Sequence, residues 1–293
     1  MSGFLTRIVF AAALVLGLGL LAAPTTAWAQ FEVEKPEIKK GEFELEYHGA
    51  YFNGLPKLPT DAARQGHEFE AFYSLTEWLQ IKAAIEVEEE RTEDGSFNSP
   101  KLSEIEGQAK VELLPIEGDG FGVSFLGRYG ESVVSNEDES SILFGPILKA
   151  ASGPLSITAN LFPVYNFDIK ETEIEFGEEG PEIEVERTPD HWNFDYALQV
   201  KHQTWERVAL GAEVFGEFED IANNVADSGS DKHRMGPVVY LSLGESHGHG
   251  GHDNEAGHSA GDLPSASLAF GVLFGLNDDT SDVALKWDAD FHF

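Results

Sequence analysis

The chain of 293 residues contains no cysteine, so it has neither a disulfide framework nor a cysteine-based metal or redox site. Basic residues are scarce as well: 19 lysines and arginines stand against 52 aspartates and glutamates, which gives a formal net charge of −33. A charge of this sign and size argues against nucleic acid and anionic lipid as partners. The chain also lacks G-x-S-x-G, HExxH, a phosphate-binding loop and C-x-x-C. We therefore predict no enzymatic activity.

Long apolar runs are missing after the first thirty residues, so a helical membrane span is not expected in the rest of the chain. The first residues, MSGFLTRIVFAAALVLGLGLLAAPTTAWAQ, place Arg7 before an apolar run that ends at Ala23, and then supply Ala27-Trp28-Ala29. This order matches the charged, apolar and cleavage regions of a secretory signal peptide. The run is shorter than the about 20 residues of a spanning helix. We predict residues 1–29 as a cleaved signal peptide.

Aromatic residues are plentiful, with 21 Phe, 7 Tyr and 5 Trp, which separates this chain from acidic disordered proteins. Apolar and polar residues alternate throughout. In LQIKAAIEVE (79–88), for example, Leu79, Ile81 and Ile85 share one face while Lys82 and Glu86 share the other. Successive side chains of a strand point to opposite faces, so this period of two predicts an all-β protein.

A soluble sandwich or barrel and a transmembrane barrel both fit such alternation. The alternating runs hold 9–13 residues, close to the about 9–11 that cross a bilayer obliquely and longer than the about 5–6 of soluble strands. Full charges line the polar face. Aromatic residues such as Trp78, Trp192 and Trp205 fall where strands meet loops, as an interfacial girdle requires. These features favour a transmembrane antiparallel up-and-down β-barrel.

The end of the chain carries the most specific pattern. VALKWDADFHF (283–293) alternates apolar residues and ends on Phe; it resembles the assembly signal of bacterial outer-membrane barrels, in which Phe291 and Phe293 would contact the assembly machinery. YSLTEWLQI (73–81), HQTWERVALG (202–211) and GLNDDTSD (275–282) resemble repeats of a transporter-like barrel family annotated with the meta-pathway of phenol (aromatic) degradation. The resemblance implies a barrel in the outer membrane of a Gram-negative bacterium, reached by secretion through the inner membrane. Trp78 stands where that family's repeat usually has Arg.

Twelve strands are predicted, an even number as in single-chain bacterial barrels. They cover about 41–52, 67–76, 78–90, 102–114, 120–133, 141–151, 154–169, 191–202, 206–219, 233–244, 265–275 and 282–293. The barrel domain is thus 41–293, preceded by a periplasmic N-terminal segment at 30–40. With both termini periplasmic, 170–190 becomes an outer loop and 245–264 a periplasmic one. The sixth strand is apolar on both faces, which leaves its phase open.

Alternation also predicts the residues that face the lumen, where acids outnumber bases. Those we expect to define it are Glu44, Glu46, Glu70, Lys82, Glu86, Glu106, Lys110, Arg128, Lys201, Glu213, Lys286 and Asp288. Such a lumen is either a solvated interior with cross-strand ion pairs or an acidic pore that favours cations. His48, His67, His191, His202 and His233 lie near strand ends, and we interpret them as rim or interfacial residues.

The periplasmic loop contains HGHGGHDNEAGH (247–258), whose potential metal ligands are His247, His249, His252, His258, Asp253 and Glu255. Imidazole binds Zn, Cu, Ni and Co, so weak binding of one of these ions is predicted, although no other cofactor is required. The spacing matches no defined zinc motif, and a flexible hydrophilic linker is the preferred explanation of the composition, with a metal role as the alternative.

Three functions remain open from the sequence. The first is an outer-membrane channel or transporter-like barrel for small solutes, with an acidic lumen that favours cations, including divalent metal. The second is a closed structural or surface-interaction barrel. The third is periplasmic metal capture through the histidine loop. Outer-membrane lipid and the barrel assembly machinery are the expected partners in each case, and nucleic acid is not.

Overall fold

The computed structural model describes residues 31–54, 63–91, 96–133, 137–177, 180–187, 189–222, 231–243, 265–278 and 280–293. The predicted signal peptide and the histidine loop lie outside these residues. Among the described residues, no helix is long and apolar enough to cross a membrane. The strands are β1 (Phe43–Asn53), β2 (Ala63–Ser74), β3 (Leu79–Glu90), β4 (Lys101–Leu114), β5 (Gly120–Ser132), β6 (Glu137–Ser152), β7 (Leu155–Gly177), β8 (Gly180–Arg187), β9 (His191–Trp205), β10 (Val208–Phe218), β11 (Lys232–Leu243), β12 (Ser265–Gly275) and β13 (Val283–His292).

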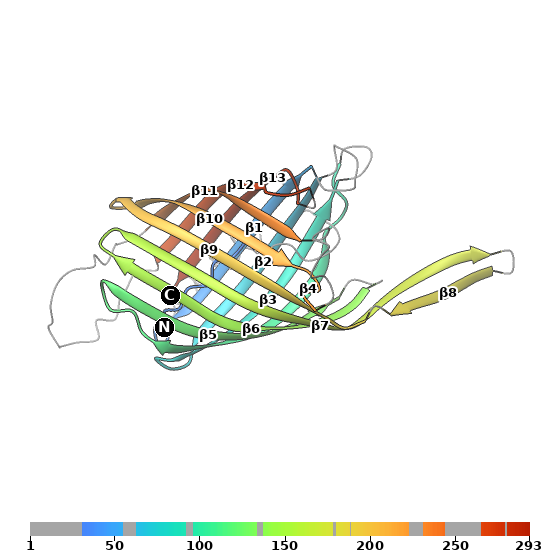
Figure 1. Ribbon diagram of the computed structural model, residues 1–293, viewed down its shortest axis with the longest axis horizontal. Coiled ribbons are helices and arrows are strands. Elements are labelled where there is room, and N and C mark those ends of the chain that lie inside the picture. Colours follow the sequence, from blue (N-terminus) through green and yellow to red (C-terminus); the bar gives the residue numbers. More distant parts are fainter. Residues whose placement is uncertain are drawn as a thin grey trace, which may run out of the picture.

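Twelve antiparallel strands close into a barrel, as predicted. Each strand from β1 to β7 pairs with the next, β7 pairs with β9, and the series continues to β13, which pairs with β1. The one described strand outside the barrel wall is β8, which pairs with the distal part of β7. Much of the predicted outer loop 170–190 is therefore a β7–β8 hairpin that extends beyond one end of the barrel, opposite the end where the C-terminus lies (Figure 1).

The seam between β1 and β13 closes the barrel through a continuous register from Glu44 opposite His292 to Asn53 opposite Val283. On the outside of this seam, Trp287 lies across Gly49 and donates a hydrogen bond from Nε1 to the Tyr47 hydroxyl, 3.1 Å away. A β-carbon at position 49 would meet Trp287 Nε1 at 2.2 Å. Glycine at this position is therefore what allows the indole to pack on the seam.

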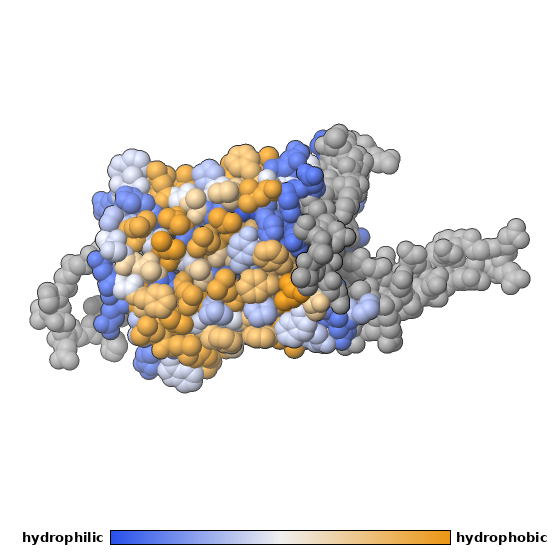
Figure 2. Space-filling view, viewed as in Figure 1, coloured by the Kyte–Doolittle hydropathy of each residue, from blue (hydrophilic) through white to orange (hydrophobic). Residues whose placement is uncertain are grey.

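The outer surface of the wall is apolar, and the polar partners of the alternation point inward. Ile81, Ile85, Phe125 and Leu285 are each 42–43% exposed, and Phe270 is 51% exposed. Figure 2 shows apolar side chains in a broad band across the middle of the visible face of the barrel, with hydrophilic residues toward its two ends. Water would make so much exposed apolar surface costly, whereas a lipid bilayer matches it.

Residues 31–40 form a segment without regular secondary structure that precedes β1, and we call residues 31–37 the N-terminal segment. Within a few residues it contacts β3, β4 and β5 as well as β7 and β13, which lie on different sides of the closed wall. Such contacts are possible only from inside the barrel. The prediction placed residues 30–40 outside the barrel, in the periplasm. This difference arises because alternation identifies wall strands but not a chain that crosses the lumen.

The lumen contains two apolar clusters in addition to its charges. Phe31 and Val33 of the N-terminal segment pack with the inward-facing Ala50, Phe52, Ala197, Phe215, Leu273 and Ala284. The second cluster consists of Leu126, Leu143, Ile147, Phe162 and Val164. The two apolar faces of β6 are thereby explained, because one faces outward and the other joins this second cluster. A uniformly acidic lumen is thus not what the fold produces.

Candidate functional site

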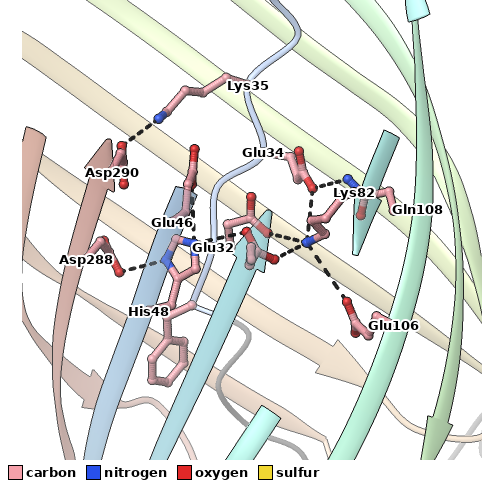
Figure 3. A network of polar contacts seen from close by, with 12 residues as sticks. Glu32, Glu34, Lys35, Glu46, His48, Lys82, Glu106, Gln108, Asp288 and Asp290 are labelled. Atoms are coloured by element: carbon pink, nitrogen blue, oxygen red, sulfur yellow. Dashed lines mark hydrogen bonds and ion pairs between the residues drawn. The ribbon is translucent and has the colours of Figure 1, made fainter. Parts of the chain in front are cut away.

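The candidate site is a network of buried charged residues where the N-terminal segment meets the wall (Figure 3). Period two on β1 turns Glu46 and His48 inward, and the strand register places Glu46 opposite Glu70 of β2 and His48 opposite Asp288 of β13. Two carboxylates directly opposite each other repel, so this register needs cations nearby. His48 and Lys82 of β3 occupy that place.

Lys82 lies at the centre of the network, with a side chain that is 1% exposed. Its ammonium contacts the Glu70 carboxylate, to which it donates a hydrogen bond, and it lies 3.9 Å from Glu106 of β4. Its distances to Glu32 and Glu34 of the N-terminal segment are 3.4 and 3.8 Å. One cation thus joins two wall strands to the segment, and its own burial is tolerable only because these carboxylates surround it.

Glu34 is the charged segment residue most completely enclosed by the wall, at 3% exposure. Gln108 donates a hydrogen bond of 2.6 Å to its carboxylate, and Lys110 and Arg128 lie 3.6 and 3.7 Å from it. Its backbone exchanges two hydrogen bonds with the side chain of Asn160, at 2.8 and 3.0 Å. The wall therefore recognises both the charge and the backbone of the segment at this residue.

The rest of the segment is fastened by similar contacts. Lys35 forms an ion pair of 2.9 Å with Asp290, and Glu37 pairs with Lys149. Lys110 donates to the Lys35 carbonyl at 2.8 Å, and Ser124 donates to the Pro36 carbonyl at 2.6 Å. Because side chains from around the barrel satisfy the polar groups of the segment, the segment does not need secondary structure of its own.

The low exposure of these residues shows that the lumen is filled at the level of the network. A charged side chain that lined a wide aqueous pore would be accessible to water from the inside, yet Glu70, Lys82 and Lys286 are 3–4% exposed. In a barrel of twelve strands the wall alone leaves more space than in one of eight. We conclude that the N-terminal segment occupies this space.

Glu32 differs from Glu34 in its electrostatic surroundings. Burial, together with the charges of Glu34 and Glu70, raises the pKa of Glu32 from its ordinary value of 4.5 to about 8. A carboxyl whose pKa is raised in the docked state binds a proton on docking, so this group favours docking below its ordinary pKa and loses that contribution as the pH rises to about 8. In the docked state, Glu32 is therefore harder to ionise than in water.

The predicted lumen residues are largely found inside. Nine of the twelve are buried, and Glu44, Lys201 and Asp288 are half-buried. The structure brings Glu46, Glu70, Lys82, Glu106 and Asp288 together in the network, along with Arg128, and it pairs Lys286 with Glu213 at 2.8 Å. Glu44 and Lys201 stand apart from it. Lys110 belongs to the network through Glu34, and Glu86 lies on β3, the strand of Lys82.

The sequence prediction missed His48 and the whole N-terminal segment. His48, interpreted as a rim residue, has a side chain that is 6% exposed and lies 3.1 Å from Asp288. His48 follows Glu44 and Glu46 at intervals of two on the first strand, and this alternation is the signal that would have placed it on the inward face. No comparable signal exists for Glu32, Glu34 and Lys35, because they belong to no strand.

The remaining predicted site residues are the C-terminal aromatic residues and the ligands of the histidine loop. Phe293 exchanges backbone hydrogen bonds with Phe43 at 2.9 and 3.3 Å, and Phe291 is half-buried on the last strand. The six potential metal ligands of the histidine loop, His247, His249, His252, Asp253, Glu255 and His258, lie outside the described residues.

Replacing Glu34 with Gln should release the N-terminal segment, whereas replacing Glu32 with Gln should not. Loss of a hydrogen bond to a buried charged group costs about 1.5–3 kcal/mol, so the Glu34→Gln variant should expose the segment about 10- to 100-fold more often. The measurement is the rate at which a water-soluble maleimide labels Val33→Cys, the only thiol in such a chain, in the presence of a chelator. Equal labelling rates for Glu34→Gln and its parent would contradict the importance of this contact.

No protein-family model and no curated protein matches the chain. Solved structures do. The translocator domain of the autotransporter NalP from Neisseria meningitidis matches with a TM-score of 0.51 and 10% identity, covering 87% of this chain and 88% of that one. The COG4313 outer membrane channel from Pseudomonas putida F1 matches with a TM-score of 0.51 and 10% identity, covering 89% of this chain and all of that one. The fold, with its apolar outer band, is therefore that of an outer-membrane β-barrel.

Proposed function

We propose that the protein is an outer-membrane channel for small solutes whose lumen is closed at rest by the N-terminal segment. The observation that carries this proposal is the attachment of the segment to the wall by side chains alone, from Asn160, Lys110, Ser124, Lys149 and Asp290. A segment held in this way can leave the lumen without unpairing any strand. The similarity to the Pseudomonas putida channel is consistent with this function.

The proposed orientation follows from the two ends of the barrel. The end with the C-terminus has the two-residue connections Gly153–Pro154 and Glu206–Arg207, whereas the other end carries the β7–β8 hairpin. Short periplasmic turns and long outer connections are typical of bacterial barrels. We therefore place the C-terminus in the periplasm, together with the histidine loop, which joins β11 to β12 at the same end. The last strand, with Phe291 and Phe293, would be the contact for the assembly machinery.

A preference for cations is proposed for the open state. On the wall that remains when the segment leaves, six acids outnumber four bases: Glu46, Glu70, Glu106, Glu213, Asp288 and Asp290 against Lys82, Lys110, Arg128 and Lys286. Carboxylates that line a narrow passage raise the local concentration of cations and exclude anions. The resemblance to the transporter-like family connected with aromatic degradation does not name a solute, so the cargo is proposed only as small and compatible with an acidic passage.

The reversal potential across a planar bilayer tests this selectivity. In a KCl gradient, openings of the purified barrel should reverse at a potential that shows K⁺ to be more permeant than Cl⁻, and the preference should shrink at 1 M salt because the Debye length falls to about 3 Å. Anion selectivity would refute the acidic passage. A complete lack of conductance, including from variants with a displaced segment, would instead favour the closed structural barrel.

A further inference from the structure

The wall and the N-terminal segment together present four potential metal ligands around one point. Oxygen atoms of Glu32, Glu46 and Glu70 and a ring nitrogen of His48 all lie within 4.8 Å of one another. Glu46, His48 and Glu70 are buried. In Figure 3, Glu46 and His48 of β1 converge with Glu32 of the segment, and Glu70 belongs to the neighbouring strand β2. The site is thus assembled from parts of the chain that meet only in the closed barrel.

The distances at this point fit a small coordination sphere. His48 Nε2 lies 3.4 Å from Glu46 Oε2 and 3.4 Å from Glu70 Oε2. Zinc binds nitrogen and oxygen ligands at about 2.0–2.2 Å, so neighbouring donors in a tetrahedral site are about 3.3–3.6 Å apart. The His48 nitrogen therefore already has, to the carboxylates of both Glu46 and Glu70, the spacing that one ion between them would need.

Two of these donor atoms are buried and lie 3.4 Å from each other as an ion pair, without a hydrogen bond of ordinary geometry. Neither His48 Nε2 nor Glu70 Oε2 has a hydrogen-bond partner among the described residues. The side chain of His48 is 6% exposed and that of Glu70 is 0% exposed. An unsatisfied buried acceptor is costly, and an ion that accepts both lone pairs would remove that cost.

The surroundings orient these ligands in the way that metal sites require. Asp288 Oδ1 lies 3.1 Å from His48 Nδ1, which keeps the proton on that nitrogen and directs the lone pair of Nε2 into the site. Lys82 occupies the other oxygen of Glu70, Oε1, and so leaves Oε2 available. Carboxylate–histidine pairs of this kind set the tautomer and raise the basicity of a ligating imidazole.

We propose that His48, Glu46, Glu70 and Glu32 bind one divalent transition-metal ion, which fastens the N-terminal segment to the barrel wall. One imidazole with three carboxylates suits an ion of the Zn²⁺ or Mn²⁺ type better than Mg²⁺, which takes oxygen ligands in an octahedral arrangement. None of these four ligands belongs to the histidine loop. Fastening affects conduction only if the proposed channel function holds, whereas metal binding itself does not depend on it.

Calorimetric titration of the purified full-length barrel with ZnCl₂ tests the proposal. The histidine loop must first be silenced by His247→Ala, His249→Ala, His252→Ala and His258→Ala, and the resulting chain should still bind one Zn²⁺. Adding His48→Ala should abolish this binding. Adding Asp288→Asn, which changes a positioning residue, should weaken it about 10- to 100-fold. Co²⁺ bound at the same site should give visible absorption bands that disappear with His48→Ala.

The controls separate a metal site from a simple ion pair of His48. His202→Ala changes an exposed histidine on β9 whose ring nitrogen lies 3.4 Å from Thr204 Oγ1, and it should leave Zn²⁺ affinity unchanged. Glu32 lies outside every strand, so the Glu32→Gln variant should fold normally. It should weaken Zn²⁺ binding at least about tenfold, and it tests the site even if the His48→Ala variant does not assemble. If the loop-silenced chain binds no Zn²⁺, or binds it equally with Glu32→Gln, the proposal is overturned. A barrel that binds Zn²⁺ but never conducts would refute the channel function and leave the metal site standing.

Discussion

Replacing Lys82 with Met should lower the free energy of unfolding of the barrel by about 3–5 kcal/mol, the usual cost of removing one partner from a buried ion pair. The methionine would fill a similar volume but would leave the carboxylates of Glu32, Glu34, Glu70 and Glu106 without their shared cation. The measurement is the denaturant midpoint in detergent micelles, followed by tryptophan fluorescence.

Lys40→Met is the matched control. Lys40 also forms an ion pair, at 2.6 Å from Glu77, but both side chains are exposed at the end of the barrel. Exposed pairs contribute little to stability, so this variant should keep the parent midpoint. Similar losses in both variants would mean that a lysine charge anywhere stabilises the barrel and that the network has no special role.

Weakening the N-terminal segment at both of its anchors should open the channel. A population shift from 1:99 to 99:1 requires about 5.5 kcal/mol. Phe31→Ala removes a buried aromatic ring at a cost of about 3–5 kcal/mol, and Glu34→Gln removes a charged hydrogen bond worth about 1.5–3 kcal/mol. The double variant should therefore convert a mostly closed barrel into a mostly open one, which single-channel recording in a planar bilayer would show as a higher open fraction.

A control in the same part of the chain is Lys39→Ala, which changes an exposed side chain paired only with the nearby Glu42. Its open fraction should equal that of the parent. Migration on a denaturing gel before and after heating would confirm that each variant is folded. A folded double variant that remains closed would show that the segment is not what closes the lumen. If the parent has the same open fraction as the double variant, the segment does not close the channel at rest.

The barrel itself could be predicted from the sequence because its information is local. Each run such as 79–88 shows by alternation which side chains share a face, and twelve runs of this kind leave a closed antiparallel sheet as the natural solution. The same rule placed Glu46, Glu70, Lys82 and Asp288 in the lumen. The same rule would also have placed His48 in the lumen, because His48 follows Glu44 and Glu46 at intervals of two on β1. The interpretation of His48 as a rim residue rests instead on its position near a strand end.

What fills the lumen could not be predicted, because the decisive contacts join residues far apart in the chain. Glu34 and Gln108 are separated by 74 positions, and Phe31 and Lys286 by 255. The N-terminal segment alternates apolar and acidic residues only from Phe31 to Glu34, which is too short to indicate that it lies inside the barrel. The alternating sequence by itself determined a membrane-type barrel wall with charged inward faces. Only the tertiary structure decided that these charges serve to hold a segment of the same chain, since the wall must first close before the cavity that receives the segment exists.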